Sequence, residues 1–356
     1  MALATVYGVF SSYTKNAILF LVLSGVLCSA TCKKKSVTPL QEIQISFTKG
    51  ADISWITEME AAGKKFYTPT GTETDCFALM KSLGMNAIRL RVWVHPATAW
   101  NSIEDVLAKA LRVHNQGLKL MIDFHYSDNW ADPGKQTKPS AWNLLDFPSL
   151  KNALITHTTE VLTRLKNVGI TPEWVQIGNE INNGMLWPDG KADIHMQNLS
   201  QLVNAGYDAS KSVFPNTKVM IHLSDGWNNN LYRWFFGQLK TQGAKWDIIG
   251  MSVYPTWYKT SGDWRACNND VLANMNDMAA TYNCDVMVVE AGYPWDRPAE
   301  GKLFLQDLIA KVKSVKNQRG TAVFYWEPQC YNNWQGYTLG AFDNSGKPTV
   351  ALDAFK

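Results

Sequence analysis

The stretch WVQIGNE, residues 174–180, changes from apolar residues to a glycine, an amide and finally the carboxylate of Glu180. A second stretch, VMVVE at residues 286–290, ends in the same way on Glu290. Short apolar runs of this kind are typical of strands that are buried on both faces, as in a parallel sheet. Longer stretches with apolar residues at every third or fourth position separate them, which is typical of helices. This alternation predicts an α/β architecture.

The pattern of an apolar run followed by a helical stretch recurs along the chain. The predicted strands are residues 47–53, 86–92, 119–124, 174–177, 218–222, 248–253, 286–290 and 322–326. Helical patterns lie between them, for example at residues 102–115, 149–167, 193–212, 268–281 and 301–316. The joins carry glycines that suit the left-handed position after a helix, namely Gly84, Gly117, Gly169, Gly243 and Gly320. Eight such units predict a (β/α)8 TIM barrel in one catalytic domain. An open doubly wound sheet is the alternative, but no GxGxxG or phosphate-loop motif follows a strand.

The composition is that of a globular protein and excludes some functional classes. Of the 356 residues, 46% are hydrophobic and 18% charged, which suffices for a large core and is too little charge for a disordered chain. The net charge of +3, with no dense basic stretch after the N-terminal region, argues against nucleic acid as a partner. The six histidines are scattered and no HExxH motif occurs, so we expect neither a metal nor another cofactor.

The N-terminal segment has the composition of an export signal. Residues 17–30 are almost wholly apolar and precede a basic run at 33–35, a length that is short for a membrane span and suits a signal peptide. We assign residues 1–31 to a signal peptide, 32–44 to a polar tether and 45–356 to the (β/α)8 barrel domain. Cys28 and Cys32 stand where a bacterial lipoprotein carries its lipid, so we expect a secreted protein or a cell-surface lipoprotein of a bacterium, and a monomer. Outside the cell a disulfide is permitted among the later cysteines, but the sequence does not show the pairing of Cys76, Cys267, Cys284 and Cys330.

Glu180 and Glu290 each end a predicted strand, and the reacting groups of a (β/α)8 barrel lie at these carboxyl ends. Cleavage of a glycosidic bond requires two carboxylates, one to protonate the leaving oxygen and one to meet the oxocarbenium-like carbon. A single glutamate could equally begin a surface helix, where the helix dipole favours a negative charge. The pair, with Asn179 directly before Glu180, favours catalysis. Glu327 is a third carboxylate whose role the spacing leaves open.

Two further strands end in polar residues. In NAIRLRVW, residues 86–93, the period of two places Arg89, Arg91 and Trp93 on one face. A buried arginine there would hold the Glu290 carboxylate ionised and oriented; the alternative is that both arginines lie at the outer rim. The stretch DFHYSDNW, residues 123–130, is rich in groups that bind sugar hydroxyls, and His125 is a candidate site residue.

The chain has 15 tryptophans, and several aromatic residues follow predicted strands. These residues are Trp187, Trp227, Tyr254, Trp257, Tyr293, Trp295 and Trp326. Rings gathered at one rim of a barrel would stack on the C–H faces of sugars. The alternative is that most of the tryptophans belong to the core.

Together the motifs identify a family. They are ADIS at 51–54, RLRVW at 89–93, DFHYSD at 123–128 with WADPG at 130–134, GNEI at 178–181, GMLWP at 184–188, VE at 289–290 with YP at 293–294, and YWEP at 325–328. This set, which spans residues 47–355 and is most specific at 123–134, resembles the endo-β-1,4-galactanases of glycoside hydrolase family 53.

The resemblance implies a retaining endo-hydrolase that cleaves internal β-1,4 bonds in galactan, including type I arabinogalactan, the side chains of pectin. It makes Glu180 the acid/base and Glu290 the nucleophile. It also implies that Arg89, His125, Asn179, Tyr254 and Trp326 line the subsite where the bond breaks, with Asp52, Trp130 and Trp187 as further binding residues. Bacterial members commonly carry calcium in a long loop after the seventh strand, but here YPWDRPAE, residues 293–300, lacks that ligand set. A mannanase or cellulase of the same barrel clan and a non-catalytic glycan-binding protein are the alternatives.

Overall fold

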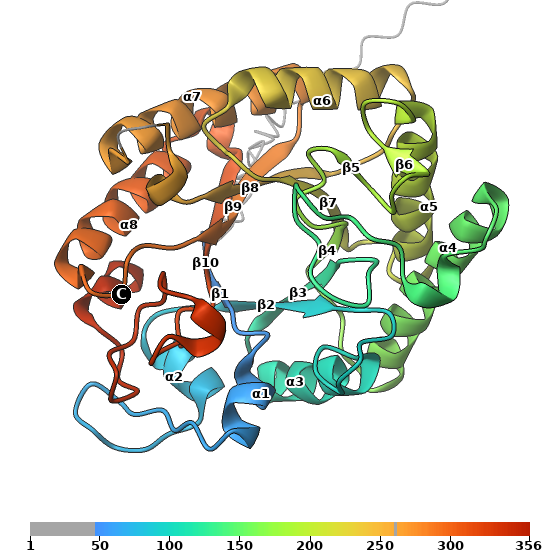
Figure 1. The fold of residues 1–356 in the computed structure, drawn as a ribbon. Helices are drawn as coiled ribbons and strands as arrows, with labels where there is room; N and C mark the ends of the chain where they lie inside the picture. The colour runs from blue at the N-terminus through green and yellow to red at the C-terminus, as the bar shows by residue number, and fades with distance from the viewer. Residues whose placement is uncertain (1–46, 260–261) are drawn as a thin grey trace, which may run out of the picture. The chain divides into compact units, whose positions relative to one another are not determined.

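The computed structural model describes residues 47–259 and 262–356, and its strands form a closed parallel barrel (Figure 1). The order around the barrel is β1-β10-β9-β8-β7-β4-β3-β2, so each strand pairs with the next barrel strand along the chain. The bounds are β1 Thr48–Asp52, β2 Ala87–Val92, β3 Lys119–Phe124, β4 Trp174–Ile177, β7 Lys218–Leu223, β8 Ile248–Val253, β9 Asp285–Ala291 and β10 Gly320–Trp326. All eight predicted strands are confirmed, with ends that differ by at most two residues.

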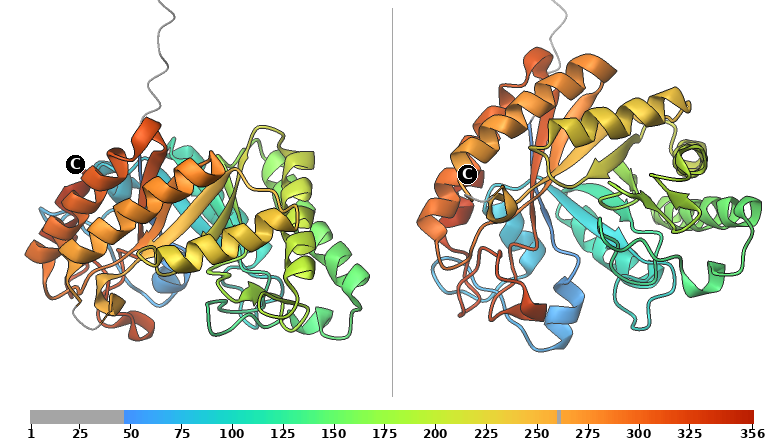
Figure 2. Two further views of the ribbon diagram at one scale, coloured as in Figure 1. Left: turned by 90° about the horizontal axis from the view of Figure 1, so that it is seen from above. Right: turned by 45° about the horizontal axis from the view of Figure 1, so that its top comes forward.

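Helices lie outside the strands in both views of Figure 2. They are α1 Ile56–Ala61, α2 Cys76–Ser82, α3 Ile103–Asn115, α4 Phe147–Asn167, α5 Met196–Val213, α6 Asn229–Thr241, α7 Trp264–Tyr282 and α8 Pro298–Lys313. Short 3₁₀ turns are η1 Ser140–Trp142, η2 Pro255–Trp257, η3 Lys316–Gln318, η4 Trp334–Gly336 and η5 Val350–Phe355, and a small hairpin pairs β5 Gly184–Met185 with β6 Gly190–Lys191. Ser102 caps α3 and Asp146 caps α4, because each side chain accepts a hydrogen bond from the first helical turn. The five predicted helices are present with shifted ends, and α1, α2 and α6 add to them.

The barrel interior has an apolar layer and, above it, a polar one. The apolar layer is Ala87, Met121, Trp174, Met220, Ile248, Met287, Val289, Ala322 and Phe324. Two positions further along several of these strands, the same inward face carries the buried polar residues Arg89, Asp123, Gln176 and His222. The apolar layer therefore closes the bottom of the barrel, and the polar side chains meet at the carboxyl ends of the strands.

Four of the five predicted helix-ending glycines have the expected backbone. Gly84, Gly117, Gly169 and Gly243 all have φ between +66° and +95°. The prediction for Gly320 is wrong, because this residue starts β10, and the left-handed residues before it are in η3. A Cβ on Gly320 would lie 1.9 Å from the Val312 carbonyl oxygen, so a close approach of two backbones requires glycine there.

The predicted signal peptide and tether, with Cys28 and Cys32, lie outside the described residues. In the described part of the chain, no helix combines the length and apolar character needed to cross a membrane. The four cysteines of that part are buried and form no disulfide with one another: Cys76, Cys267, Cys284 and Cys330.

Candidate active site

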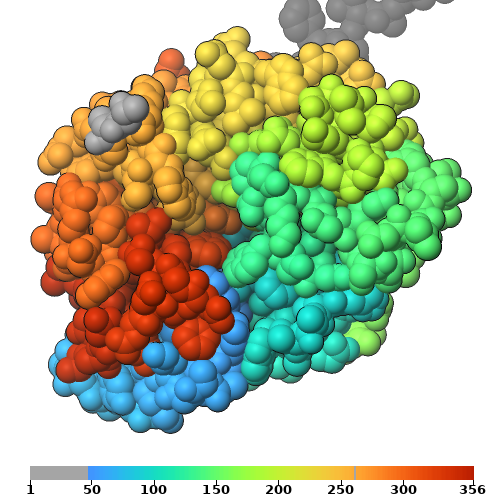
Figure 3. All heavy atoms as spheres, in the orientation of Figure 1, coloured from blue at the N-terminus to red at the C-terminus, as the bar shows by residue number. Residues whose placement is uncertain are grey.

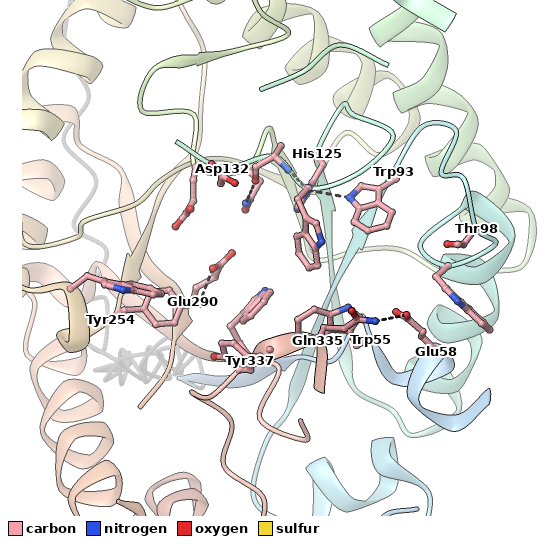
Figure 4. A pocket seen from close by; sticks show the side chains of 18 residues that line it. Trp55, Glu58, Trp93, Thr98, His125, Asp132, Tyr254, Glu290, Gln335 and Tyr337 are labelled. Carbon is pink, nitrogen blue, oxygen red and sulfur yellow. Dashed lines mark hydrogen bonds between the residues drawn. The ribbon is translucent and has the colours of Figure 1, made fainter. Parts of the chain in front are cut away.

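A cavity of about 600 Å³ lies at the carboxyl ends of the barrel strands. Figure 3 shows a hollow on this face between the red C-terminal segment and the green segment opposite. Seven of the ten predicted site residues line the cavity: His125, Trp130, Asn179, Glu180, Tyr254, Glu290 and Trp326. In Figure 4 Glu290 and Tyr254 lie at one end of the cavity, and Thr98 and Glu58 at the other.

Glu290 reaches the cavity through an irregularity in β9. Strict alternation would point Glu290 away from the barrel, because its neighbour Val289 belongs to the interior layer. The register between β8 and β9 shifts by one residue at this point, so that Met251 pairs with Val288 but Ser252 pairs with Glu290. Such a β-bulge re-aims the following side chain, and here it turns Glu290 inward.

Two groups contact the Glu290 carboxylate directly. The Arg89 guanidinium lies 3.0 Å from Oε1, and the Tyr254 hydroxyl donates to Oε2 at 3.0 Å. Burial raises the pKa of Glu290 to about 7, and Arg89 opposes this rise by stabilising the ionised form. The contacts fix the orientation of a carboxylate that faces the cavity.

Glu180 follows β4 in a strained backbone. Gly178 has φ +77° and Glu180 itself has φ +45°. Residues other than glycine seldom adopt a positive φ. The Ser252 hydroxyl donates to Glu180 Oε1 at 2.6 Å. Burial, together with the charge of Glu290, raises the pKa of Glu180 to about 8. Arg89 contacts the Glu290 carboxylate directly at 3.0 Å, which favours the negative charge on Glu290 and the proton of the pair on Glu180.

Arg89 joins the buried polar residues under the cavity. Its side chain is 1% exposed and forms ion pairs with Asp52 at 2.7 Å, Asp123 at 2.9 Å and Glu290 at 3.0 Å. It also donates to Asn179 Oδ1 at 2.9 Å. Burial alone would lower the pKa of Arg89, but the three carboxylates raise it, so the guanidinium remains charged. The prediction that a buried arginine on this strand holds Glu290 is confirmed for Arg89.

Replacing Arg89 with methionine should lower kcat/KM about 10²- to 10³-fold, the effect of removing one group that stabilises charge at a reaction centre. It should also lower the free energy of unfolding by about 3–5 kcal/mol, because three buried carboxylates lose their shared cation. Kinetics and urea unfolding would measure the two effects. Arg112→Met is the matched control, since Arg112 bridges Glu60 and Asp75 outside the barrel. A variant of Arg89 with the kcat/KM of the Arg112 variant would contradict this role.

The comparisons with known proteins agree on one family. The family described as "Glycosyl hydrolase family 53" matches residues 48–355. The chain belongs to this family. An uncharacterized protein of Niallia circulans is 34% identical over 87% of this chain and 94% of its own length. An arabinogalactan endo-β-1,4-galactanase of Thermothelomyces thermophilus is 32% identical over 86% of this chain and 98% of its own length. A solved structure of fungal β-1,4-galactanases superimposes with a TM-score of 0.80 at 31% identity, over 86% of this chain and 98% of that one.

The remaining predicted residues of this family 53 site lie outside the cavity lining. Asp52 is fully buried and accepts hydrogen bonds from Arg89 and from Ser54, so it orients Arg89 and has no surface for a substrate. Trp187 lies in the turn between β5 and β6, where its indole nitrogen donates to the Asn183 carbonyl at 2.9 Å. These contacts place Asp52 behind Arg89, whereas it was predicted to bind the substrate, and Trp187 is not among the residues that line the cavity.

Arg91 and Glu327 form a second buried pair in the family 53 barrel. Arg91 lies 2.6 Å from Glu327 Oε1 and over the Trp130 ring at 4.2 Å. The side chains of Arg89 and Arg91 are each 1% exposed, so the alternative that both arginines lie at the outer rim is wrong. Glu327 also accepts a hydrogen bond from the Trp55 N–H. Glu327 therefore holds Arg91 and the Trp55 backbone in place from below and does not reach the cavity.

The aromatic prediction holds for part of the family 53 cavity. Trp130, Tyr254, Trp257 and Trp326 line it, whereas Trp187, Trp227, Tyr293 and Trp295 are absent from the lining. The lining also contains aromatic residues that were not named as rim residues: Trp55, Trp93, Trp100 and Tyr337. Trp55 could have been found, because it follows the first predicted strand by two residues.

His125 is held in one orientation at the cavity wall. Its Nε2 lies 3.0 Å from Asp123 Oδ2, and its Nδ1 accepts from the Trp93 indole at 3.3 Å. Burial would raise the pKa of Asp123, but Arg89 and His125 outweigh it and lower this pKa. Across residues 47–259 and 262–356, no group of three or more His, Cys, Asp and Glu side chains is arranged to hold a metal ion.

Proposed function

We propose that this protein is a retaining endo-β-1,4-galactanase. The observation that carries the proposal is that two carboxylates, Glu180 and Glu290, line one cavity at the carboxyl ends of β4 and β9. Two carboxylates at one site are the requirement of glycosidic cleavage, and relatives over nearly the whole chain are named for this activity.

In this proposal Glu290 is the nucleophile. A nucleophile must be ionised when the substrate binds, and the Arg89 cation and the Tyr254 hydroxyl both stabilise the charged form. Its inward position, set by the bulge in β9, directs it to the anomeric carbon of a sugar in the cavity.

Glu180 is the acid/base. Its raised pKa keeps the proton available near neutral pH, which is the property of a general acid. Once it has given this proton to the leaving oxygen, the same carboxylate takes a proton from water in the second half of the reaction.

The substrate is β-1,4-galactan, including the galactan chains of type I arabinogalactan. Trp55, Trp130 and Trp326 lie against one another with ring centroids 5.2–5.9 Å apart, and they provide an apolar floor for the C–H faces of sugars. Both catalytic carboxylates are present with intact contacts, which argues against a binding protein without activity.

The attack should be internal, because the cavity extends well beyond the reacting pair. The viscosity of a β-1,4-galactan solution should fall before much reducing sugar appears, when both are followed in one reaction. Mannan and carboxymethylcellulose serve as control polymers and should stay intact. Galactose as the main product from the first minutes would point to attack at chain ends, and depolymerised mannan or cellulose would point to the sister activities.

For the location, we propose export through residues 1–31 and, in a bacterium, anchoring through a lipid on Cys28 or Cys32. The support is the apolar run at 17–30 followed by basic residues. A large polymer such as galactan must meet its hydrolase outside the cell.

A further inference from the structure

Ser252 stands beside both reacting carboxylates. It lies on β8, is 1% exposed, and is paired in register with Glu290 at the bulge of β9. Its hydroxyl donates to Glu180 Oε1 at 2.6 Å, a length within the range of a hydrogen bond to a charged oxygen. One of the two oxygens of Glu180 is therefore occupied by Ser252.

His222, on the inward face of β7, forms a hydrogen bond with the Ser252 hydroxyl. His222 Nε2 lies 2.9 Å from Ser252 Oγ, and the ring is completely buried. Burial and the nearby charge of Arg89 hold the pKa of His222 well below its usual value, so the ring is neutral and one nitrogen carries the hydrogen.

The backbone decides which nitrogen that is. The Glu180 N–H, whose hydrogen has a fixed direction, points at His222 Nδ1 at 3.4 Å. Asn179 Oδ1, 3.0 Å from Nδ1, favours the opposite tautomer, but this oxygen already accepts from Arg89 and Gln176. With Nδ1 as acceptor, the hydrogen is on Nε2 and is donated to Ser252 Oγ.

We propose that Ser252 and His222 are positioning residues that assign the transferable proton of Glu180 to Oε2. His222 Nε2–H donates to Ser252 Oγ, and this leaves the Ser252 hydrogen to point only at Glu180 Oε1. Oε1 is thus kept as an acceptor, and the acid form of Glu180 carries its hydrogen on the other oxygen. The inference rests on the proposed role of Glu180 as the acid/base.

The arrangement serves both halves of the reaction without a change in Ser252 or His222. In the first half, Glu180 Oε2 gives its proton to the glycosidic oxygen as the C–O bond breaks and Glu290 bonds to the anomeric carbon. In the second half, water bonds to that carbon, its proton returns to Oε2, and the ester bond to Glu290 breaks. Ser252 and His222 keep their hydrogens throughout.

Other charges also act on Glu180. Glu290 on β9 and Asp225 after β7 raise the pKa of Glu180, whereas Arg89 on β2 and the Ser252 hydrogen bond lower it. A hydrogen bond to the ionised form favours that form. Loss of the Ser252 hydroxyl should therefore move the pKa of Glu180 upward.

The test is the pH dependence of kcat/KM for Ser252→Ala. On galactan the alkaline limb should move to higher pH by about one unit, and kcat should fall about tenfold to a hundredfold, as expected for loss of one hydrogen bond to a charged group. On a dinitrophenyl galactoside, whose leaving group needs no proton, kcat/KM should change less than about threefold while kcat falls with the slower second half. Ser252→Thr, which keeps the hydroxyl, should restore the wild-type alkaline limb.

Ser210→Ala is the matched control, because Ser210 is equally buried but its hydroxyl donates to the Gly206 carbonyl within α5. Equal losses on both substrates with an unmoved alkaline limb would overturn the inference and leave Ser252 a structural role. Nitrogen-15 NMR of the wild-type histidine rings tests it without any substitution, and a hydrogen on His222 Nδ1 would also overturn it. A wild-type enzyme inactive on every galactoside would instead refute the proposed function.

Discussion

Glu290→Ala should lower kcat/KM by about four to six orders of magnitude, the scale on which enzymes lose rate with their nucleophile. The loss should be as large on an activated aryl galactoside as on galactan, because a better leaving group cannot replace the attacking atom. The fold should persist, since Arg89 keeps its ion pairs with Asp52 and Asp123. Initial rates on both substrates and a thermal melting curve would measure this.

Glu58→Ala is the matched control for a glutamate in the same cavity. The Glu58 carboxylate accepts a hydrogen bond from Gln335 at 2.9 Å and lies at the end away from Glu290 in Figure 4. Its loss should act on KM more than on kcat. A Glu290 variant that keeps even a hundredth of the wild-type kcat on the aryl galactoside would show that another group attacks the anomeric carbon.

Local patterns predict the barrel because its strands are short, apolar and closed by polar residues. The same alternation predicts the inward face of β2, since Arg89 stands two residues after Ala87, a member of the interior layer. It does not predict the inward turn of Glu290, because the bulge in β9 depends on its register with β8. Strand register is set between neighbours and leaves no mark in the sequence of one strand.

The end of the cavity that lies away from Glu290 could not be predicted either, because residues far apart in the sequence form it. Glu58 follows β1, whereas Gln335 belongs to a 3₁₀ turn near the end of the chain, and the closure of the barrel brings them together. Trp187 was also expected at the cavity, but it lies in the turn between β5 and β6 and is not among the residues that line the cavity. Loops are positioned by what they pack on, and not by their own sequence.

Glu180→Ala should separate the two half-reactions. On galactan, whose leaving oxygen needs a proton, kcat/KM should fall about 10²- to 10⁴-fold, the usual contribution of general acid catalysis. On a dinitrophenyl galactoside the first half should proceed, and the intermediate should then wait for a base. We expect a burst of dinitrophenol equal to the enzyme concentration, followed by slow turnover, in a stopped-flow trace.

The pH dependence should change in the same variant. In the wild-type enzyme the acid form of Glu180 exists below its raised pKa of about 8, so kcat/KM on galactan should fall as the pH rises through this value. In Glu180→Ala this alkaline limb should disappear. An alkaline limb that persists unchanged would assign the general acid to another residue.

Azide then identifies which carboxylate does what, because it is a nucleophile that needs no base. With Glu180→Ala, azide should attack the glycosyl-enzyme formed on Glu290 and release a β-galactosyl azide, since two inversions retain the configuration. With Glu290→Ala there is no covalent intermediate, so azide in the vacated space should displace the leaving group directly and give the α-azide. Proton NMR of the anomeric signals distinguishes the products. Exchanged configurations would reverse the two roles, and an inverted product from the wild-type enzyme would rule out the covalent intermediate altogether.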